Sequence, residues 1–141
     1  AHSERYAGYT LRQVCNEMHG FYREAKVKDL QRLCFRASSF PELAMSPKDA
    51  YAALVANDVD YVPLDTIKGR VSATLALIYP PGIGVVLPGE RWDERAQPML
   101  DYFRAFQESF NRFPGFNYEV QGVYQERIDG RIRFHTYVVR E

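Results

Sequence analysis

The sequence is poor in cysteine, and its 141 residues include only Cys15 and Cys34. Both fall inside helix-like patterns, which is typical of reduced, buried thiols in a cytoplasmic protein. The sequence also lacks an excess of either charge, because 18 basic residues balance 18 acidic ones. A surface for nucleic acid or an anionic membrane needs clustered basic residues, so neither partner is expected. No apolar run approaches the roughly 18 residues of a membrane span, and the N-terminal residues do not follow the pattern of a secretory signal.

Residues that could form a metal site or a nucleophilic centre are also few. His2, His19 and His135, with two separated cysteines, show none of the ligand spacings known for zinc, so no metal site is expected. Cys15 and His19 lie four residues apart on a predicted helix and could form a catalytic dyad. No third residue is available to orient the pair, and Cys15 lies on the apolar side of that helix. The pattern therefore favours a buried thiol beside a partly exposed histidine.

The glycines and lysines do not indicate a cofactor site either. Gly82, Gly84 and Gly89 could be taken for a dinucleotide-binding loop, but that loop needs a strand before it and a helix after it. Here a second apolar segment follows, which favours a turn-rich pair of strands. The four lysines all lie in polar helix or loop contexts, whereas a Schiff-base lysine needs a desolvated pocket that lowers its pKa. We therefore expect no cofactor to be bound by this chain alone.

The N-terminal half carries clear helix signals. Thr10 and Gln13 form a capping-box pattern, which predicts a helix over about 10–25. A shorter helix is expected over 28–36, where apolar residues recur at helical spacing. A serine followed by proline and, two residues later, an acid predicts a third helix over about 46–57.

After residue 58 the pattern changes to strands and one long helix. The expected elements are strands over 59–62, 70–79 and 83–87, a helix over 94–112, and a hairpin that turns at Asp129-Gly130. The hairpin arms carry Tyr118, Val120 and Tyr124 on one side and Ile132, Phe134, Thr136 and Val138 on the other. This order predicts an α+β fold with N-terminal helices, a small mixed or antiparallel sheet, a long helix and a C-terminal β-hairpin.

The only tryptophan, Trp92, stands among charged residues directly after a Pro-Gly turn. Burial in the core of the domain is the favoured interpretation. The alternative is an interface anchor or the wall of a cleft, because tryptophan and arginine are enriched at binding hot spots.

Short motifs along most of the chain resemble one family, the C-terminal domain of the bacterial pyridoxal-phosphate-dependent ornithine, lysine and arginine decarboxylases. Each motif is weak alone, but their order over this length is specific. They are Tyr9-Thr10-Leu11-Arg12-Gln13, Glu17-Met18-His19, Val27-Lys28-Asp29-Leu30-Gln31, Phe35-Arg36, Ser39-Phe40-Pro41, Met45-Ser46-Pro47-Lys48-Asp49-Ala50, Tyr79-Pro80-Pro81-Gly82, Pro88-Gly89-Glu90, Phe113-Pro114-Gly115-Phe116 and Gln121-Gly122-Val123-Tyr124.

The resemblance implies an enzyme that binds pyridoxal phosphate on a lysine and releases carbon dioxide from a basic amino acid, leaving a diamine or polyamine such as putrescine. The family's Ser-x-His-Lys motif is not in this sequence, so the cofactor belongs to the parent enzyme and no catalytic residue is expected here. In the family this domain packs beside the cofactor domain and helps to wall the entrance of an active site at a dimer interface. By motif position, Tyr79, Glu90, Arg91 and Trp92 are the candidates for that wall, where Glu90 would attract a cationic substrate.

Two departures bear on the substrate. Ile78 stands where many members have proline, and Thr74 stands where several have an acid. Ornithine is favoured, while lysine and arginine stay open. Residues 1–8 are expected to form a connector and residues 9–141 the domain, with the remainder of the decarboxylase and a second subunit as partners. Because the chain opens at Ala1 without methionine, a cut piece is favoured over the alternative, a stand-alone interaction or regulatory module of the same fold.

Overall fold

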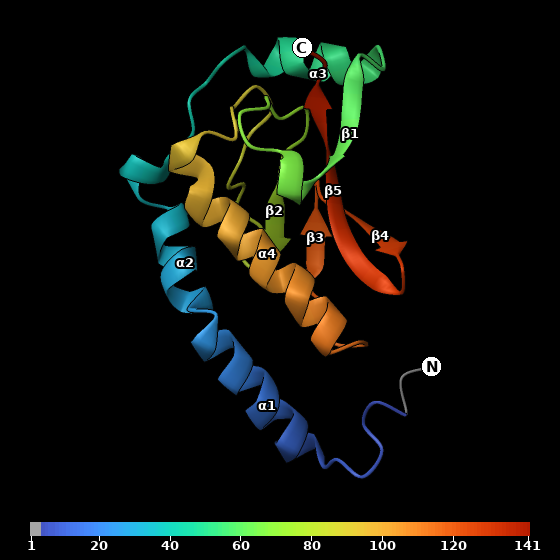
Figure 1. The fold of residues 1–141 in the computed structure, drawn as a ribbon. Helices are drawn as coiled ribbons and strands as arrows, with labels where there is room; N and C mark the ends of the chain where they lie inside the picture. The colour runs from blue at the N-terminus through green and yellow to red at the C-terminus, as the bar shows by residue number, and fades with distance from the viewer. Residues whose placement is uncertain (1–3) are drawn as a thin grey trace.

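Three helices precede the first strand in the computed structural model, which describes residues 4–141 (Figure 1). The α-helices are α1 (Leu11–Glu24), α2 (Val27–Cys34), α3 (Pro47–Val55) and α4 (Gln97–Arg112). The strands are β1 (Val59–Pro63), β2 (Leu77–Tyr79), β3 (Glu119–Gln121), β4 (Tyr124–Ile128) and β5 (Arg131–Val139). The predicted α+β class is confirmed, because the helices and the strands come in separate runs and the described strands pair antiparallel, without the regular βαβ order of a parallel sheet.

The helices begin where their capping residues predict. The backbone N–H of Gln13 donates to the Thr10 hydroxyl at 3.3 Å, and the Gln13 side chain accepts from the Thr10 N–H at 2.7 Å. At α3 the Ser46 hydroxyl accepts from the N–H of Asp49 at 3.1 Å, and proline occupies the first turn. These contacts satisfy amides that a helix start leaves unpaired, so both predicted helix starts are confirmed.

Two antiparallel sheets carry the strands. One has the order β1-β5-β4, with Val59 opposite Val139, and the other pairs β2 with β3. The predicted C-terminal hairpin is confirmed as β4 and β5, which are joined at Asp129 and Gly130. Both turn residues have positive φ, as a tight hairpin turn requires.

Two predicted strands are wrong in extent. Of the strand expected over 70–79, only β2 forms, and the segment before it makes single bridges to separate partners. The segment 83–87 makes one bridge, between Val86 and Ala76. The apolar pattern is explained in part by burial, although Leu75, Ile83 and Leu87 are exposed. The buried apolar residues of these two segments are Val71, Ala73, Ala76, Leu77, Ile78, Val85 and Val86. The Ser72 hydroxyl donates to the Thr74 carbonyl at 2.9 Å, an example of a side chain that competes with strand hydrogen bonds.

The arm assigned to the hairpin before residue 122 is also wrong. Val120 pairs with Ile78 across β2 and β3, so it belongs to the smaller sheet. Gly122 separates the two pairings with a φ of +71°. A side chain there would overlap the carbonyl of Leu75, so only glycine permits the close approach of these segments.

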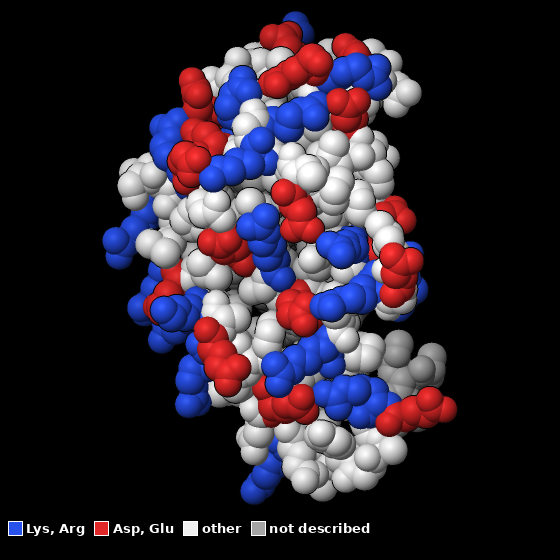
Figure 2. Space-filling model, in the orientation of Figure 1, with Lys and Arg blue, Asp and Glu red and all other residues white. Residues whose placement is uncertain are grey.

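The main core lies between α4 and the larger sheet. Figure 1 shows α4 crossing one face of β5, while α2 runs along the outer side of α4. The predicted apolar stripe of α4 is confirmed as buried, together with the phenylalanine that follows it: Met99, Phe103, Phe106, Phe110 and Phe113. Outside this core, Figure 2 shows basic and acidic side chains interleaved over the face drawn, as the balanced charge predicts.

The N-terminal region differs in part from the prediction. Cys34 is buried as expected, but Cys15 is exposed, because the side of α1 that carries it does not face the rest of the domain. Residues 1–3 of the expected connector, including His2, lie outside the described residues. The following residues contact the end of α4 and its loop, since the Tyr6 hydroxyl donates to the Pro114 carbonyl at 3.0 Å.

Candidate functional site

Trp92, one of the four residues predicted for a cleft wall, lies inside the domain. Its side chain is 1% exposed, and its ring packs edge-on against Phe103 with 6.3 Å between centroids. Its backbone is held on both sides: the N–H donates to the Arg70 carbonyl at 2.9 Å, and the carbonyl accepts from the N–H of Gly69 at 2.8 Å. The favoured interpretation as a core residue is therefore confirmed. Trp92 anchors the segment that carries its two neighbours.

Arg91 is directed toward the C-terminal end of the chain. Its guanidinium donates to the Gly69 carbonyl and to the carboxylate of Glu141, at 2.5 and 3.1 Å. The side chain is partly exposed, and both of these hydrogen bonds come from its Nη1 group. Arg91 therefore ties the segment before Trp92 to the end of β5.

Glu90 is half-buried beside a small cavity of about 200 Å³. One carboxylate oxygen accepts from the N–H of Leu87 at 2.7 Å, which closes the Pro-Gly turn. At the centre of that turn Gly89 has a φ of +89°, and a side chain there would overlap the Met45 carbonyl. Burial raises the pKa of the Glu90 carboxyl, the Leu87 hydrogen bond lowers it by less, and the negative charge of Asp93 adds to the rise.

Tyr79 closes β2 with a side chain that is 53% exposed. Its ring lies against Gly82, where an added Cβ would come within 2.7 Å of it. The next residue, Pro80, lines a larger cavity, but Tyr79 itself lines neither cavity. Of the four predicted residues only Glu90 lines one of these two cavities, and neither cavity brings the four side chains together.

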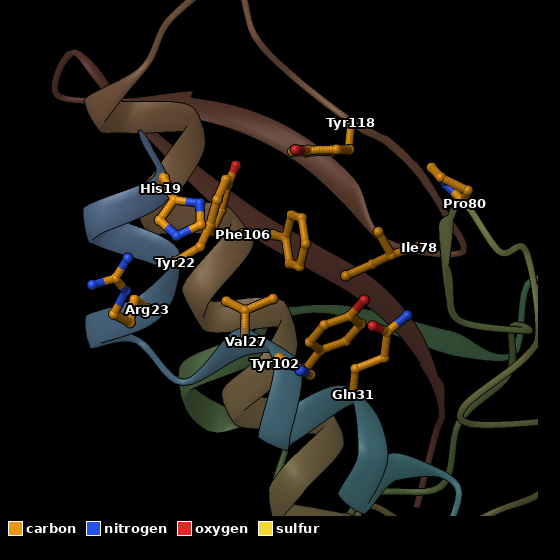
Figure 3. A pocket seen from close by; sticks show the side chains of 11 residues that line it. His19, Tyr22, Arg23, Val27, Gln31, Ile78, Pro80, Tyr102, Phe106 and Tyr118 are labelled. Carbon is orange, nitrogen blue, oxygen red and sulfur yellow. The ribbon is translucent and has the colours of Figure 1, made fainter. Parts of the chain in front are cut away.

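The larger cavity, of about 530 Å³, opens where α1, α2, α4 and β2 meet (Figure 3). Its floor is apolar and aromatic, and polar groups lie around it. The lining residues are His19, Tyr22, Arg23, Val27, Lys28, Gln31, Ile78, Pro80, Tyr102, Phe106 and Tyr118.

Two of the phenols that line this cavity, Tyr22 and Tyr102, have a raised pKa. The hydroxyls of Tyr22 and Ser109 lie 2.6 Å apart, and burial raises the pKa of Tyr22. Burial also raises the pKa of Tyr102 to about 12. Both side chains therefore stay protonated at neutral pH, so neither is a general base. The arrangement suits binding of an apolar group with a polar end.

Residues 4–141 contain no group of three His, Cys, Asp or Glu side chains that could hold a metal ion. Within the same residues, no helix is both long and apolar enough to cross a membrane.

The match to a known family covers most of the chain. Residues 28–140 match the family described as Orn/Lys/Arg decarboxylase, C-terminal domain. The chain belongs to this family. Among relatives of this C-terminal domain, ornithine decarboxylase of Haemophilus influenzae is 48% identical over 98% of the chain and 19% of its own length. Inducible ornithine decarboxylase of Escherichia coli is 47% identical over 99% of the chain and 19% of its own length.

The fold of this decarboxylase C-terminal domain agrees with that of a solved relative. Lysine decarboxylase A from Pseudomonas aeruginosa superimposes with a TM-score of 0.86 at 32% sequence identity, over 96% of this chain and 18% of that one. The chain thus spans about a fifth of the length of the relatives it matches.

Sequence reasoning did not predict the larger cavity of this C-terminal domain. Tyr22 and Phe106 lie on apolar helix faces, and their periodicity indicates only that they are core residues. The cavity arises because Tyr118 and Pro80 approach from separate strands and loops. The one feature of the sequence that points to this cavity is the presence of tyrosine hydroxyls on helix faces that are otherwise apolar.

Proposed function

We propose that this chain is the C-terminal domain of a pyridoxal-phosphate-dependent ornithine decarboxylase, which forms putrescine and carbon dioxide. The observation that carries the proposal is the identity of 47–48% to two ornithine decarboxylases over nearly the whole chain. Lysine decarboxylase LdcA of Pseudomonas aeruginosa is 40% identical over 93% of the chain. Ornithine is therefore the preferred substrate in this proposal, ahead of lysine and arginine.

The chain's own residues do not fit pyridoxal phosphate, so we place the cofactor in the remainder of the enzyme. All four lysines are exposed: Lys26, Lys28, Lys48 and Lys68. A lysine that forms a Schiff base needs a desolvated pocket. Lys28 borders the larger cavity, but it is exposed to solvent, as are the other three lysines. The proposed role of the domain is assembly with the remainder of the enzyme and a second subunit, and support of the entrance to the active site.

Within that role, Tyr79 and Glu90 are the residues proposed to face the substrate entrance. Their exposed or half-exposed side chains support this assignment, and Trp92 with Arg91 would hold the segment from behind. An acidic group near an entrance raises the local concentration of a cationic amino acid through its field. One unit charge about 10 Å away in water contributes ~0.4 kcal/mol, which corresponds to roughly a twofold effect on encounter.

The test is decarboxylation by the full-length protein that contains these residues. We expect colour from pyridoxal phosphate and a higher kcat/KM for ornithine than for lysine or arginine. A native product near the 16.3 kDa of this chain, colourless and inert with ornithine, would refute the proposal and favour a separate interaction module.

The entrance role needs its own measurement. We expect Glu90→Gln to lower kcat/KM for ornithine about twofold at low salt and to match the wild type at high salt, where charges are screened. The matched control is Glu24→Gln, which removes an exposed carboxylate of α1. Equal salt dependence for wild type and Glu90→Gln would remove Glu90 from this role.

A further inference from the structure

The small cavity beside Glu90 is walled by apolar groups from two parts of the chain. Phe35, Phe40 and Pro41 follow the end of α2, and Val85 and Leu87 belong to the loop before the Pro-Gly turn. Its volume of about 200 Å³ is room for about seven water-sized groups. An unbranched aliphatic chain of four or five atoms and its terminal group would fill it.

The only carboxylate at this cavity has no basic partner in the domain. Residues 4–141 form twelve ion-pair contacts, and none of them includes Glu90. The adjacent Arg91 is engaged by Gly69 and Glu141, so it does not neutralise its neighbour. A half-buried carboxylate without a cation carries a desolvation cost that an incoming cation would offset.

The contacts of Glu90 and the walls of the cavity favour an ammonium group over a metal ion or a guanidinium. A divalent metal needs several oxygen or nitrogen ligands, and the described residues offer no group of three acidic, His or Cys side chains. A planar guanidinium pairs best when it reaches both oxygens of a carboxylate at once, and the Leu87 N–H already takes one of the acceptor sites on one Glu90 oxygen, so the approach of a guanidinium is more restricted. An ammonium is compact and can bind through the remaining oxygen, with its carbon chain against the aromatic and aliphatic walls.

We propose that Glu90 and this cavity bind an alkylammonium group, a protonated primary amine on an unbranched aliphatic chain. The amine could be a free small molecule or the side chain of a lysine in a neighbouring polypeptide segment. The inference deepens the entrance role proposed for Glu90, because it names the group that the same carboxylate would hold, and the observations behind it are the cavity and its carboxylate.

The test is a titration of the protein with n-butylammonium chloride, followed by NMR at the backbone amides of Leu87 and Gly84. Leu87 donates to the Glu90 carboxylate, and Gly84 lines the cavity. Uncharged n-butanol is the matched probe for the apolar walls alone. We expect saturable shifts at both amides with butylammonium and at least tenfold weaker binding of butanol.

Two variants separate the charge from the cavity. Glu90→Gln keeps the shape of the side chain and is expected to weaken butylammonium binding at least tenfold while leaving butanol unchanged. Gly84→Ala keeps the carboxylate, and its Cβ would come 2.5 Å from Leu75 Cδ1 and 3.2 Å from Leu87 Cδ2, so it is expected to weaken both probes. Glu24→Gln is the control for charge alone. The proposal is overturned if butylammonium binds no tighter than butanol, or if Glu90→Gln leaves its binding intact.

The source of the amine is decided on the longer protein. A carbodiimide cross-link between Glu90 and a lysine, identified by mass spectrometry, would assign the site to a protein side chain. Butylammonium binding there without such a cross-link would assign it to a free amine. Neither readout uses decarboxylation, so failure here is distinct from failure of the proposed function.

Discussion

Replacing Gly122 by alanine tests whether the close contact between β3 and the segment before β2 holds the two sheets together. The added Cβ would overlap the Leu75 carbonyl oxygen and lie 2.6 Å from its carbon and 3.2 Å from the Cα of Ala76. The Gly122 carbonyl accepts hydrogen bonds from the hydroxyls of Thr74 and Thr136 at 3.0 and 2.5 Å. The backbone therefore cannot move away without breaking these bonds.

Two costs add at this position. An alanine in the left-handed region costs about 1–2 kcal/mol, and overpacking costs about 1–3 kcal/mol more. We expect Gly122→Ala to lower the free energy of unfolding by about 2–5 kcal/mol. The matched control is Gly130→Ala in the hairpin turn, where φ is +78° and no atom lies within 4 Å of the added Cβ. That variant should lose only the first cost, about 1–2 kcal/mol.

Urea unfolding of the wild type and both variants measures the difference. The comparison is sound if the slopes of free energy against urea are equal, because a changed slope signals a change in the exposed surface. Equal destabilisation by Gly122→Ala and Gly130→Ala would refute the reasoning, since it would mean that the contact with Leu75 adds nothing.

Other measurements test separate parts of the structure. Iodoacetamide at pH 8 should label the exposed Cys15 and spare the buried Cys34, because burial raises the pKa of the Cys34 thiol to about 12. Equal labelling of the two cysteines in the folded protein would contradict the burial of Cys34. Asn111→Ala should lower the free energy of unfolding by about 1–3 kcal/mol, because the Asn111 side-chain amide bridges α4 and β5. The control is Asn117→Ala at an exposed position, which should leave the free energy of unfolding measured in urea nearly unchanged. Hydrogen bonds from two arginines lower the pKa of Asp60, so its contribution to stability is present above its ordinary pKa and is lost as pH falls through the lowered value. Urea unfolding at several acidic pH values should therefore show a weaker pH dependence for Asp60→Asn, and an unchanged dependence would contradict the assignment.

Local chemistry accounts for the parts of the fold that could be predicted. The helix starts at Thr10 and Ser46 depend on hydrogen bonds between residues three apart, so a short stretch of sequence contains both partners. The hairpin at Asp129 and Gly130 depends on two residues that tolerate positive φ. The buried stripe of α4 follows from apolar residues at helical spacing.

The segment between β1 and α4 could not be predicted in the same way. Its apolar alternation indicates burial, and burial is observed, but strand pairing also needs a partner backbone in register. The bridge partners of Val71 and Ala76 lie in the segment 86–91, whereas the partner of Ser72 lies in β5, so no continuous ladder forms. A pattern of side chains does not identify which backbone lies beside it.

The residues of the candidate site also divide into features that the sequence predicts and features that depend on the tertiary structure. The sequence by itself determined the family through the order of its short motifs, and it identified Glu90 and Trp92 as unusual. Tertiary structure alone decided that the Trp92 side chain lies in the core, that Arg91 is engaged by Glu141, and that Glu90 faces an apolar cavity without a cation. The physical reason is that burial and ion pairing depend on residues far apart in the sequence, and folding alone brings those residues together.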